Sequence, residues 1–242
     1  MNMRRDPIII TGAGHSGTRG LVTVLGAVTG VYLGDVGNPF KEWDFYRLLA
    51  RNVNAWLLSL PEVHDNNVIA PDVIRDFRAS EDQRVACAAR IESEITKHWN
   101  LSQPPRGSGP WVFKSPRTTL CLEIWRTVFP DARFVHLIRD GRDVAVATWS
   151  PAAGSVERRF ELWRARVNRI WAYQQEGMPI VDVRYEDLPD PAALKALCGA
   201  VGLPYASRMH GLLRMHSGHG TELMQGLPYS RAELMRYGYV ND

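Results

Sequence analysis

Short apolar runs recur along the chain and are separated by longer segments with helical spacing. The runs are rich in β-branched residues and span residues 7–11, 111–114, 133–138 and 179–183, with 31–33 as a further candidate strand. A continuous apolar strand is typical of a parallel sheet, because helices cover both faces of such a sheet. The pattern therefore predicts an α/β fold in three layers, with a mostly parallel central sheet flanked by helices.

Capping residues mark the starts of two predicted helices. Ser80 and Gln83 form a capping box, which begins a helix that runs to about residue 99. Asp190 is an N-cap residue followed by Pro191, which is favoured in the first helical turn. The first helix lies between two of the apolar runs, and the second follows the last of them.

A third helix is predicted over residues 155–175, where large apolar side chains share one face. They are Phe160, Trp163, Val167, Ile170 and Trp171. We interpret this stripe as core rather than as a cofactor site, because a helix packed on a sheet needs such a face. The whole chain, residues 1–242, is predicted to be one domain, and the less regular segment 205–242 is predicted to be a lid or a tail.

Composition narrows the possible classes of protein only slightly. The net charge of +3 is small and the charges are scattered, which does not indicate a nucleic-acid surface. Cys87, Cys121 and Cys198 are widely spaced and odd in number, so neither a disulfide framework nor a metal knuckle is predicted. No run approaches the roughly 20 apolar residues of a membrane span. We expect a soluble, cytoplasmic protein.

The first strand leads into a glycine-rich turn, "GAGHSGTR", at residues 12–19. Glycines after a strand allow backbone N–H groups to turn inward, and the N-terminus of the next helix favours an anion at the same place. Ser16 and Thr18 add hydroxyl donors. The sequence therefore predicts a phosphate cradle, although such a turn is by itself compatible with an ordinary connection. Because the Gly-Lys-Ser/Thr of a nucleoside triphosphatase is missing, hydrolysis of ATP or GTP is not favoured.

Four motifs, taken in order, resemble those of the sulfotransferases that use 3′-phosphoadenosine 5′-phosphosulfate (PAPS). "HSGTR" is similar to the family's Lys/Arg-Ser-Gly-Thr-Thr, and "FVHLIRDGRD" to its Arg-Asn/Asp-Pro/Gly-x-Asp after a strand. "FKSP" resembles the Lys-Ser/Thr-Pro of the carbohydrate-modifying branch. "VRYEDL" is similar to the Tyr-Glu-Asp-Leu that follows a late core strand in the family. Together they span residues 8–188.

The resemblance implies a role for each motif. Lys114 matches the catalytic lysine, Arg139 the arginine that binds the 3′-phosphate, and Tyr185 a tyrosine that contacts adenine, for which a core role is the alternative. PAPS would be the co-substrate, no metal would be needed, and the acceptor would be a hydroxyl of a carbohydrate or a small molecule. The 5′-phosphosulfate would be held by Gly14, His15, Ser16, Gly17, Thr18 and Arg19.

The general base is predicted from the segment "KEWDFY", which is similar to the carbohydrate branch. The histidine that serves as base in the small-molecule branch falls on Pro116, so the resemblance selects Glu42, with Asp44 in reserve. Neighbouring aromatic side chains would raise the pKa of a carboxyl group by desolvation, which suits a base near neutral pH. An exposed acidic residue in the first turn of a helix is the alternative.

The chain departs from the family pattern at two places. His15 stands where the family has lysine or arginine, and we hypothesise that Arg19 supplies the missing cation. The family's 3′-phosphate serine falls on Ala147, for which Thr148 or Ser150 would have to substitute. Two other functions stay open: a kinase of the P-loop class with an altered cradle, and a nucleotide-binding module without catalysis.

Overall fold

A parallel sheet lies at the centre of the fold in the computed structural model, which describes residues 7–28, 70–101, 112–114, 116–147, 154–213, 222, 224 and 230–240. Its strands follow the order β2-β1-β3-β4, with Ile10 beside Lys114 and Thr11 beside His136. The carboxyl ends of β1, β2 and β3 therefore meet at one edge of the sheet. The strands are β1 (Ile8–Thr11), β2 (Val112–Lys114), β3 (Arg133–Ile138) and β4 (Ile180–Arg184).

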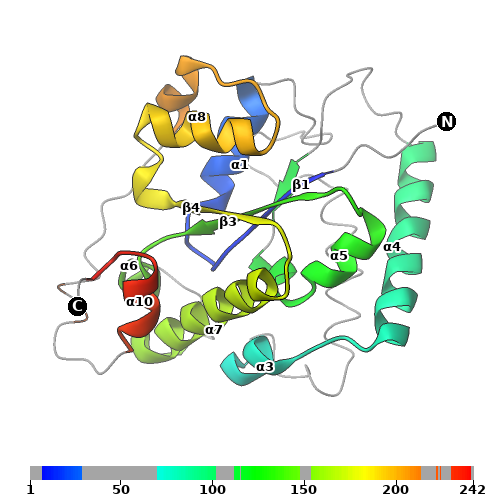
Figure 1. The fold of residues 1–242 in the computed structure, drawn as a ribbon, viewed down its shortest axis with the longest axis horizontal. Helices are drawn as coiled ribbons and strands as arrows, with labels where there is room; N and C mark the ends of the chain where they lie inside the picture. Colours follow the sequence, from blue (N-terminus) through cyan, green and yellow to red (C-terminus); the bar gives the residue numbers. More distant parts are fainter. Residues whose placement is uncertain are drawn as a thin grey trace.

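Helices cover both faces of this sheet, so the predicted three-layer α/β fold is confirmed. Figure 1 shows α1 and α8 on one side of the strands and α3 and α7 on the other. The first layer consists of α1 (Thr18–Val28), α8 (Pro191–Ala200) and η4 (Ser207–Leu212), and the second of α3 (Pro71–Asp76), α4 (Glu81–Leu101), α5 (Leu122–Val128) and α7 (Val156–Gln175). Shorter elements are η1 (Pro116–Leu120), α6 (Gly141–Val146), η3 (Tyr185–Asp187) and α10 (Ala232–Arg236).

The alternation of side chains along β1 explains its continuous apolar sequence. Ile8 and Ile10 belong to the apolar cluster formed with α1 and α8, whereas Ile9 belongs to the cluster formed with α4, α5 and α7. All three isoleucines are fully buried. A strand that is covered on both faces has no position that favours a polar side chain.

The four predicted strands are confirmed, as are the two capped helix starts. Backbone and side-chain groups of Ser80 and Gln83 bond each other at 2.9 and 3.2 Å, as a capping box requires. Asp190 accepts a hydrogen bond from the N–H of Ala192 at 2.9 Å. The candidate strand at residues 31–33 lies outside the described residues.

The predicted core stripe of α7 is correct except at its last member. Phe160, Trp163, Val167 and Ile170 are buried, but Trp171 is 42% exposed and its ring lies 4.4 Å below the guanidinium carbon of Arg236. One residue along a helix is a rotation of about 100°, which takes Trp171 off the buried face. Its ring still contributes by a cation–π contact on the surface.

The described part of the C-terminal segment packs against the domain. Leu234 in α10 is fully buried, and Glu233 accepts a hydrogen bond from Asn168 of α7 at 2.7 Å. Met209 in η4 is also fully buried and belongs to the cluster around α1 and α8. Both ends of the segment thus add to the apolar core.

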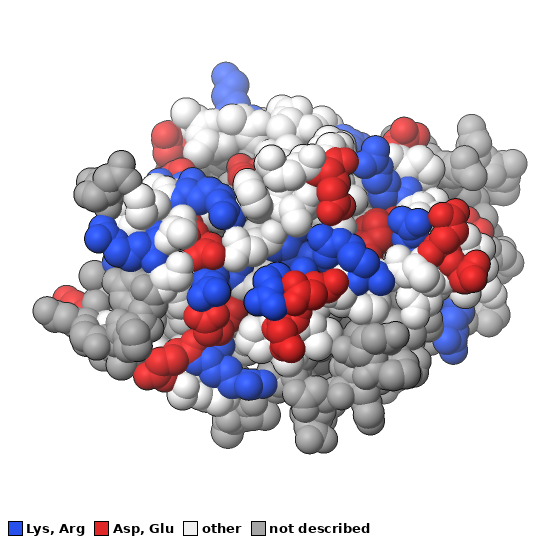
Figure 2. All heavy atoms as spheres, turned by 60° about the horizontal axis from the view of Figure 1, so that its bottom comes forward, with Lys and Arg blue, Asp and Glu red and all other residues white. Residues whose placement is uncertain are grey.

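Charges of both signs are interspersed on the face shown in Figure 2. Close pairs of opposite charge also occur among the described residues: Arg164 lies 2.8 Å from a carboxylate oxygen of Glu161 and 3.5 Å from one of Glu233. Such pairing is in keeping with the small net charge of the chain. Among the described helices, none has the length and apolar character needed to cross a membrane.

The three cysteines, for which no disulfide framework is predicted, are free and buried. Burial raises the pKa of Cys87 to about 12 and the pKa of Cys198 above its ordinary value. These thiols stay protonated near neutral pH. They act as small apolar side chains of the core.

Candidate functional site

The turn between β1 and α1 has the backbone geometry of an anion cradle. His15 and Gly17 adopt the left-handed region, with φ of 64° and 90°. The N–H and the hydroxyl of Ser16 both donate to the carbonyl of Ala13, at 3.3 and 2.7 Å, which tightens the turn. Gly17 O accepts the first helical bond, from Leu21 N at 3.2 Å. The first N–H groups of a helix have no intrahelical acceptor, and a helix N-terminus favours an anion.

Tyr185 of the "VRYEDL" motif lies between the cradle and the end of β3. A methyl group added at Gly17 would come within 2.5 Å of the Tyr185 ring, so the backbone and the ring are in direct contact. The guanidinium carbon of Arg139 lies 4.8 Å from the centre of the same ring. Two features therefore require glycine at position 17: the positive φ, and the ring of Tyr185, which occupies the space that a side chain would need.

Arg139 follows β3 directly and its guanidinium reaches the cradle. Nη1 donates to the carbonyl of His15 at 3.3 Å, and Nη2 lies 3.4 Å from a carboxylate oxygen of Asp143. The carbonyl of Arg139 accepts a hydrogen bond from Nε1 of Trp163 at 3.0 Å. The structure thus joins the predicted phosphosulfate turn to the predicted 3′-phosphate arginine, which lie 124 positions apart in the sequence.

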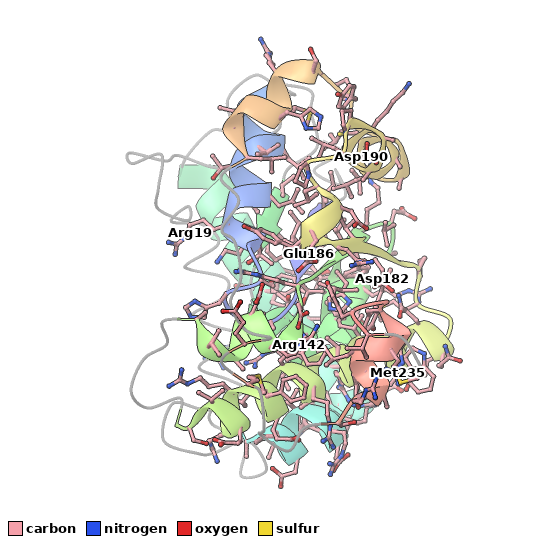
Figure 3. All side chains as sticks on the ribbon, turned by 90° about the vertical axis from the view of Figure 1, so that its left-hand side faces the viewer. Arg19, Arg142, Asp182, Glu186, Asp190 and Met235 are labelled. Carbon is pink, nitrogen blue, oxygen red and sulfur yellow. The ribbon has the colours of Figure 1, made fainter. Side chains whose placement is uncertain are left out.

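A network of polar side chains fixes the turn that follows Arg139, and sequence reasoning did not find it. Glu186 accepts hydrogen bonds from the backbone N–H of Asp140 at 3.0 Å and from the hydroxyl of Tyr239 at 2.8 Å. Arg142 pairs with Asp140 at 2.6 Å and donates to the carbonyl of Tyr239 at 3.0 Å. The one available signal was the glutamate of the Tyr-Glu-Asp motif. Figure 3 labels both residues near the middle of the view; Arg142 is buried, whereas Glu186 is exposed.

Lys114 is the last residue of β2, beside β1. Its side chain is 9% exposed, and its backbone is in register with Ile10, two residues before the glycine-rich turn begins. Thr119 of η1 exchanges a hydroxyl hydrogen bond of 2.8 Å with Thr11, the last residue of β1. This bond holds the segment after Lys114 against the start of the cradle.

Arginine side chains lie near the cradle, whereas His15 itself is neutral. Partial burial, followed by the positive charges of Arg139 and Arg159, lowers the pKa of His15 from 6.5. The histidine therefore carries little charge at pH 7 in the protein without an anion. Arg19 is exposed, and Figure 3 shows its side chain at the periphery. Arg159 is a cation of this region that sequence reasoning missed, because it looks like any polar position of α7.

Several predicted site residues lie outside the described part of the chain. They are Glu42, Asp44, Thr148 and Ser150. Ala147 is described, and it follows the last residue of α6 without a polar side chain to offer. Within the described ranges, no group of three or more His, Cys, Asp or Glu side chains is placed to hold a metal ion.

Comparisons with known proteins bear on the family and the fold of the chain. A sequence profile of the sulfotransferase family matches residues 7–207. The fold is similar to the sulfotransferase domain of the Synechococcus olefin synthase, with a TM-score of 0.56 and 16% identity over 100% of this chain and 91% of that one. It is also similar to the sulfotransferase domain of the curacin biosynthetic pathway, with a TM-score of 0.55 and 15% identity over 99% and 100% of the two chains.

A third solved structure has a similar fold. The sulfotransferase STF1 of Mycobacterium tuberculosis aligns with a TM-score of 0.51 and 18% identity over 98% of this chain and 77% of that one. No curated protein matches the sequence. At these identities the solved structures establish the fold, and the profile establishes the family.

Proposed function

The chain belongs to the sulfotransferase family, and from this premise we propose that it transfers a sulfuryl group from PAPS to a hydroxyl of a carbohydrate or small-molecule acceptor. The observation that carries the proposal is the junction of two anion-binding elements at one edge of the sheet. The guanidinium of Arg139 bonds the carbonyl of His15 in the cradle, and Tyr185 contacts both elements. A donor with phosphate groups at two ends needs two such elements at a fixed separation.

The proposed donor site assigns one anion to each element. Backbone N–H groups of residues 14–19, with the buried hydroxyl of Thr18, would hold the 5′-phosphosulfate. Ser16 would join them by exchanging its two bonds to the carbonyl of Ala13 for bonds to the anion. Arg139 would bind the 3′-phosphate with its planar fork of donors. Arg19, exposed in the first turn of α1, is proposed to supply the charge that neutral His15 does not. Contact of Tyr185 with adenine stays a prediction.

The proposed reaction is an in-line displacement at sulfur. The acceptor oxygen bonds to sulfur while the bond from sulfur to the bridging phosphate oxygen breaks, and 3′-phosphoadenosine 5′-phosphate (PAP) leaves. Lys114 would stabilise the negative charge that develops on that bridging oxygen. Glu42 would take the proton from the acceptor hydroxyl, a role that contributes typically about 10²–10⁴-fold in rate.

Ligand-dependent thermal stability distinguishes this function from a nucleotide kinase. PAP at 100 times its dissociation constant would add about 2.7 kcal/mol to the free energy of unfolding, which raises the melting temperature by several degrees. We expect PAP to stabilise the protein more than ATP with magnesium at equal concentration. The proposal is refuted by a larger shift with ATP.

The variant E42Q tests the base separately from the donor site. A glutamine keeps the size of the side chain but cannot accept the proton, so turnover should fall by about 10²-fold or more while the affinity for PAP stays the same. Unchanged turnover would exclude Glu42. The variant D44N, measured in parallel, shows whether Asp44 is the base instead.

A further inference from the structure

Building on the proposed function, we propose that Arg159 is a second donor-binding cation, which binds the 3′-phosphate together with Arg139. Arg159 lies in the first turn of α7, whose N-cap is Ser155. The sequence carries no motif at this position. The structure brings it to the C-terminal end of α6, the helix that begins two residues after Arg139.

The guanidinium of Arg159 is held in place by backbone carbonyls. Nε donates to Gly154 at 3.0 Å, and Nη1 donates to Ala145 at 3.2 Å with a longer contact of 3.5 Å to Ala147. These bonds do not use Nη2, for which no described residue is an acceptor. Carbonyl acceptors orient the guanidinium without neutralising its charge, so the side chain is prepared for an anion.

The local balance of charge also points to an anion. Within the described part of the chain, no carboxylate forms an ion pair with Arg159, whereas Asp143, the acid of α6, pairs with Arg139. Both arginines are near enough to His15 to disfavour its protonated form. Two guanidinium groups and a polar imidazole thus lie in a region where Ala147 offers no polar side chain. A phosphate dianion would restore the balance.

The alternative is that Arg159 only joins α6 to α7 through its carbonyl bonds. The two roles predict different ligand dependence, because a structural defect affects every ligand of the site. PAP and adenosine 5′-phosphate (AMP) differ only in the 3′-phosphate. Their affinities, measured by calorimetric titration for each variant, therefore separate the roles.

For the variant R159Q we expect the affinity for PAP to fall by about tenfold or more and the affinity for AMP to change by less than about twofold, because one charge-assisted phosphate contact is lost. R159K, which keeps the charge but not the planar fork, should recover part of the loss. The matched control is R158Q, which removes the same charge from an exposed neighbour on α7 and should leave both affinities unchanged.

If R159Q loses affinity for PAP and for AMP by the same factor, Arg159 has only the structural role and the inference is wrong. If the affinity of R159Q for PAP is unchanged, Arg159 does not bind the donor and the inference is also wrong. If R159Q does not fold, the affinities of R159K for PAP and AMP distinguish the two roles in the same way. A wild-type protein that fails to bind PAP refutes the proposed function itself, and the inference with it.

Discussion

The contact between Gly141 and Trp163 predicts that the substitution G141A destabilises the protein. Gly141 is the first residue of α6, and a methyl group there would lie 2.4 Å from Cε3 and 2.5 Å from Cδ2 of the Trp163 ring. Trp163 is fully buried, and its Nε1 donates to the carbonyl of Arg139 at 3.0 Å. Neither the ring nor the helix has room to move without breaking packing or this hydrogen bond.

The cost follows from two effects of similar size. Overpacking of a well-filled core costs about 1–3 kcal/mol, and a weakened buried hydrogen bond costs about 0.5–1.5 kcal/mol. Restriction of the unfolded chain by alanine returns up to about 1 kcal/mol. The free energy of unfolding should therefore fall by roughly 0.5–4.5 kcal/mol. For a chain of this size the melting temperature drops by about 2–4 °C per kcal/mol.

Urea denaturation followed by circular dichroism measures this change, and G199A is the matched control. Gly199 lies in α8 with nothing within 4 Å of an added methyl group, so alanine there should stabilise the protein by about 0.5–1 kcal/mol. The two substitutions should thus change the free energy of unfolding in opposite directions. The steric reasoning is refuted if G141A matches the wild type within about 0.5 kcal/mol or is stabilised as G199A is.

Three further predictions concern the site. The variant K114A should lower kcat by about 10²-fold or more with a smaller effect on the affinity for PAP, and equal kcat in variant and wild type would remove Lys114 from the mechanism. Y239F deletes the hydroxyl that bonds Glu186, so urea denaturation should show a loss of about 1 kcal/mol, whereas no loss would mean that this bond does not support the turn after Arg139. Because the pKa of His15 is lowered in the protein without an anion, a bound phosphate should raise it and binding should take up a proton. The affinity of the wild type for PAP, relative to that of H15Q, should then rise as the pH falls from about 8 to 6, and parallel pH profiles would contradict this.

The strands and the cradle were predictable because their signals are local. Each strand is a continuous apolar run, and the turn after β1 is marked by glycines beside hydroxyl residues. The capping pairs at Ser80 and Asp190 satisfy helix termini within a few residues of themselves. Such features depend on neighbouring positions alone, which is the range over which periodicity and turn chemistry act.

The site as a whole was less accessible to prediction. The motifs marked His15, Lys114 and Arg139 as separate residues, but they did not show that Arg139 bonds the cradle backbone. Nothing local distinguishes Arg159 from the exposed arginines of α7, or Trp171 from the buried tryptophan eight positions earlier. These distinctions depend on which helix packs where.

The sequence by itself determined that this protein is an α/β domain with a glycine-rich turn, for which phosphate binding is predicted, and the motif order of a sulfotransferase. Only the tertiary structure decided the strand order β2-β1-β3-β4, which places the ends of β1 and β3 side by side. It also decided that Glu186 and Trp163 hold the turn after β3, from 46 and 24 positions away. The physical reason is that secondary structure follows from hydrogen bonds and apolar spacing along the chain, whereas the contacts of the site join residues that only the packing of the layers brings together.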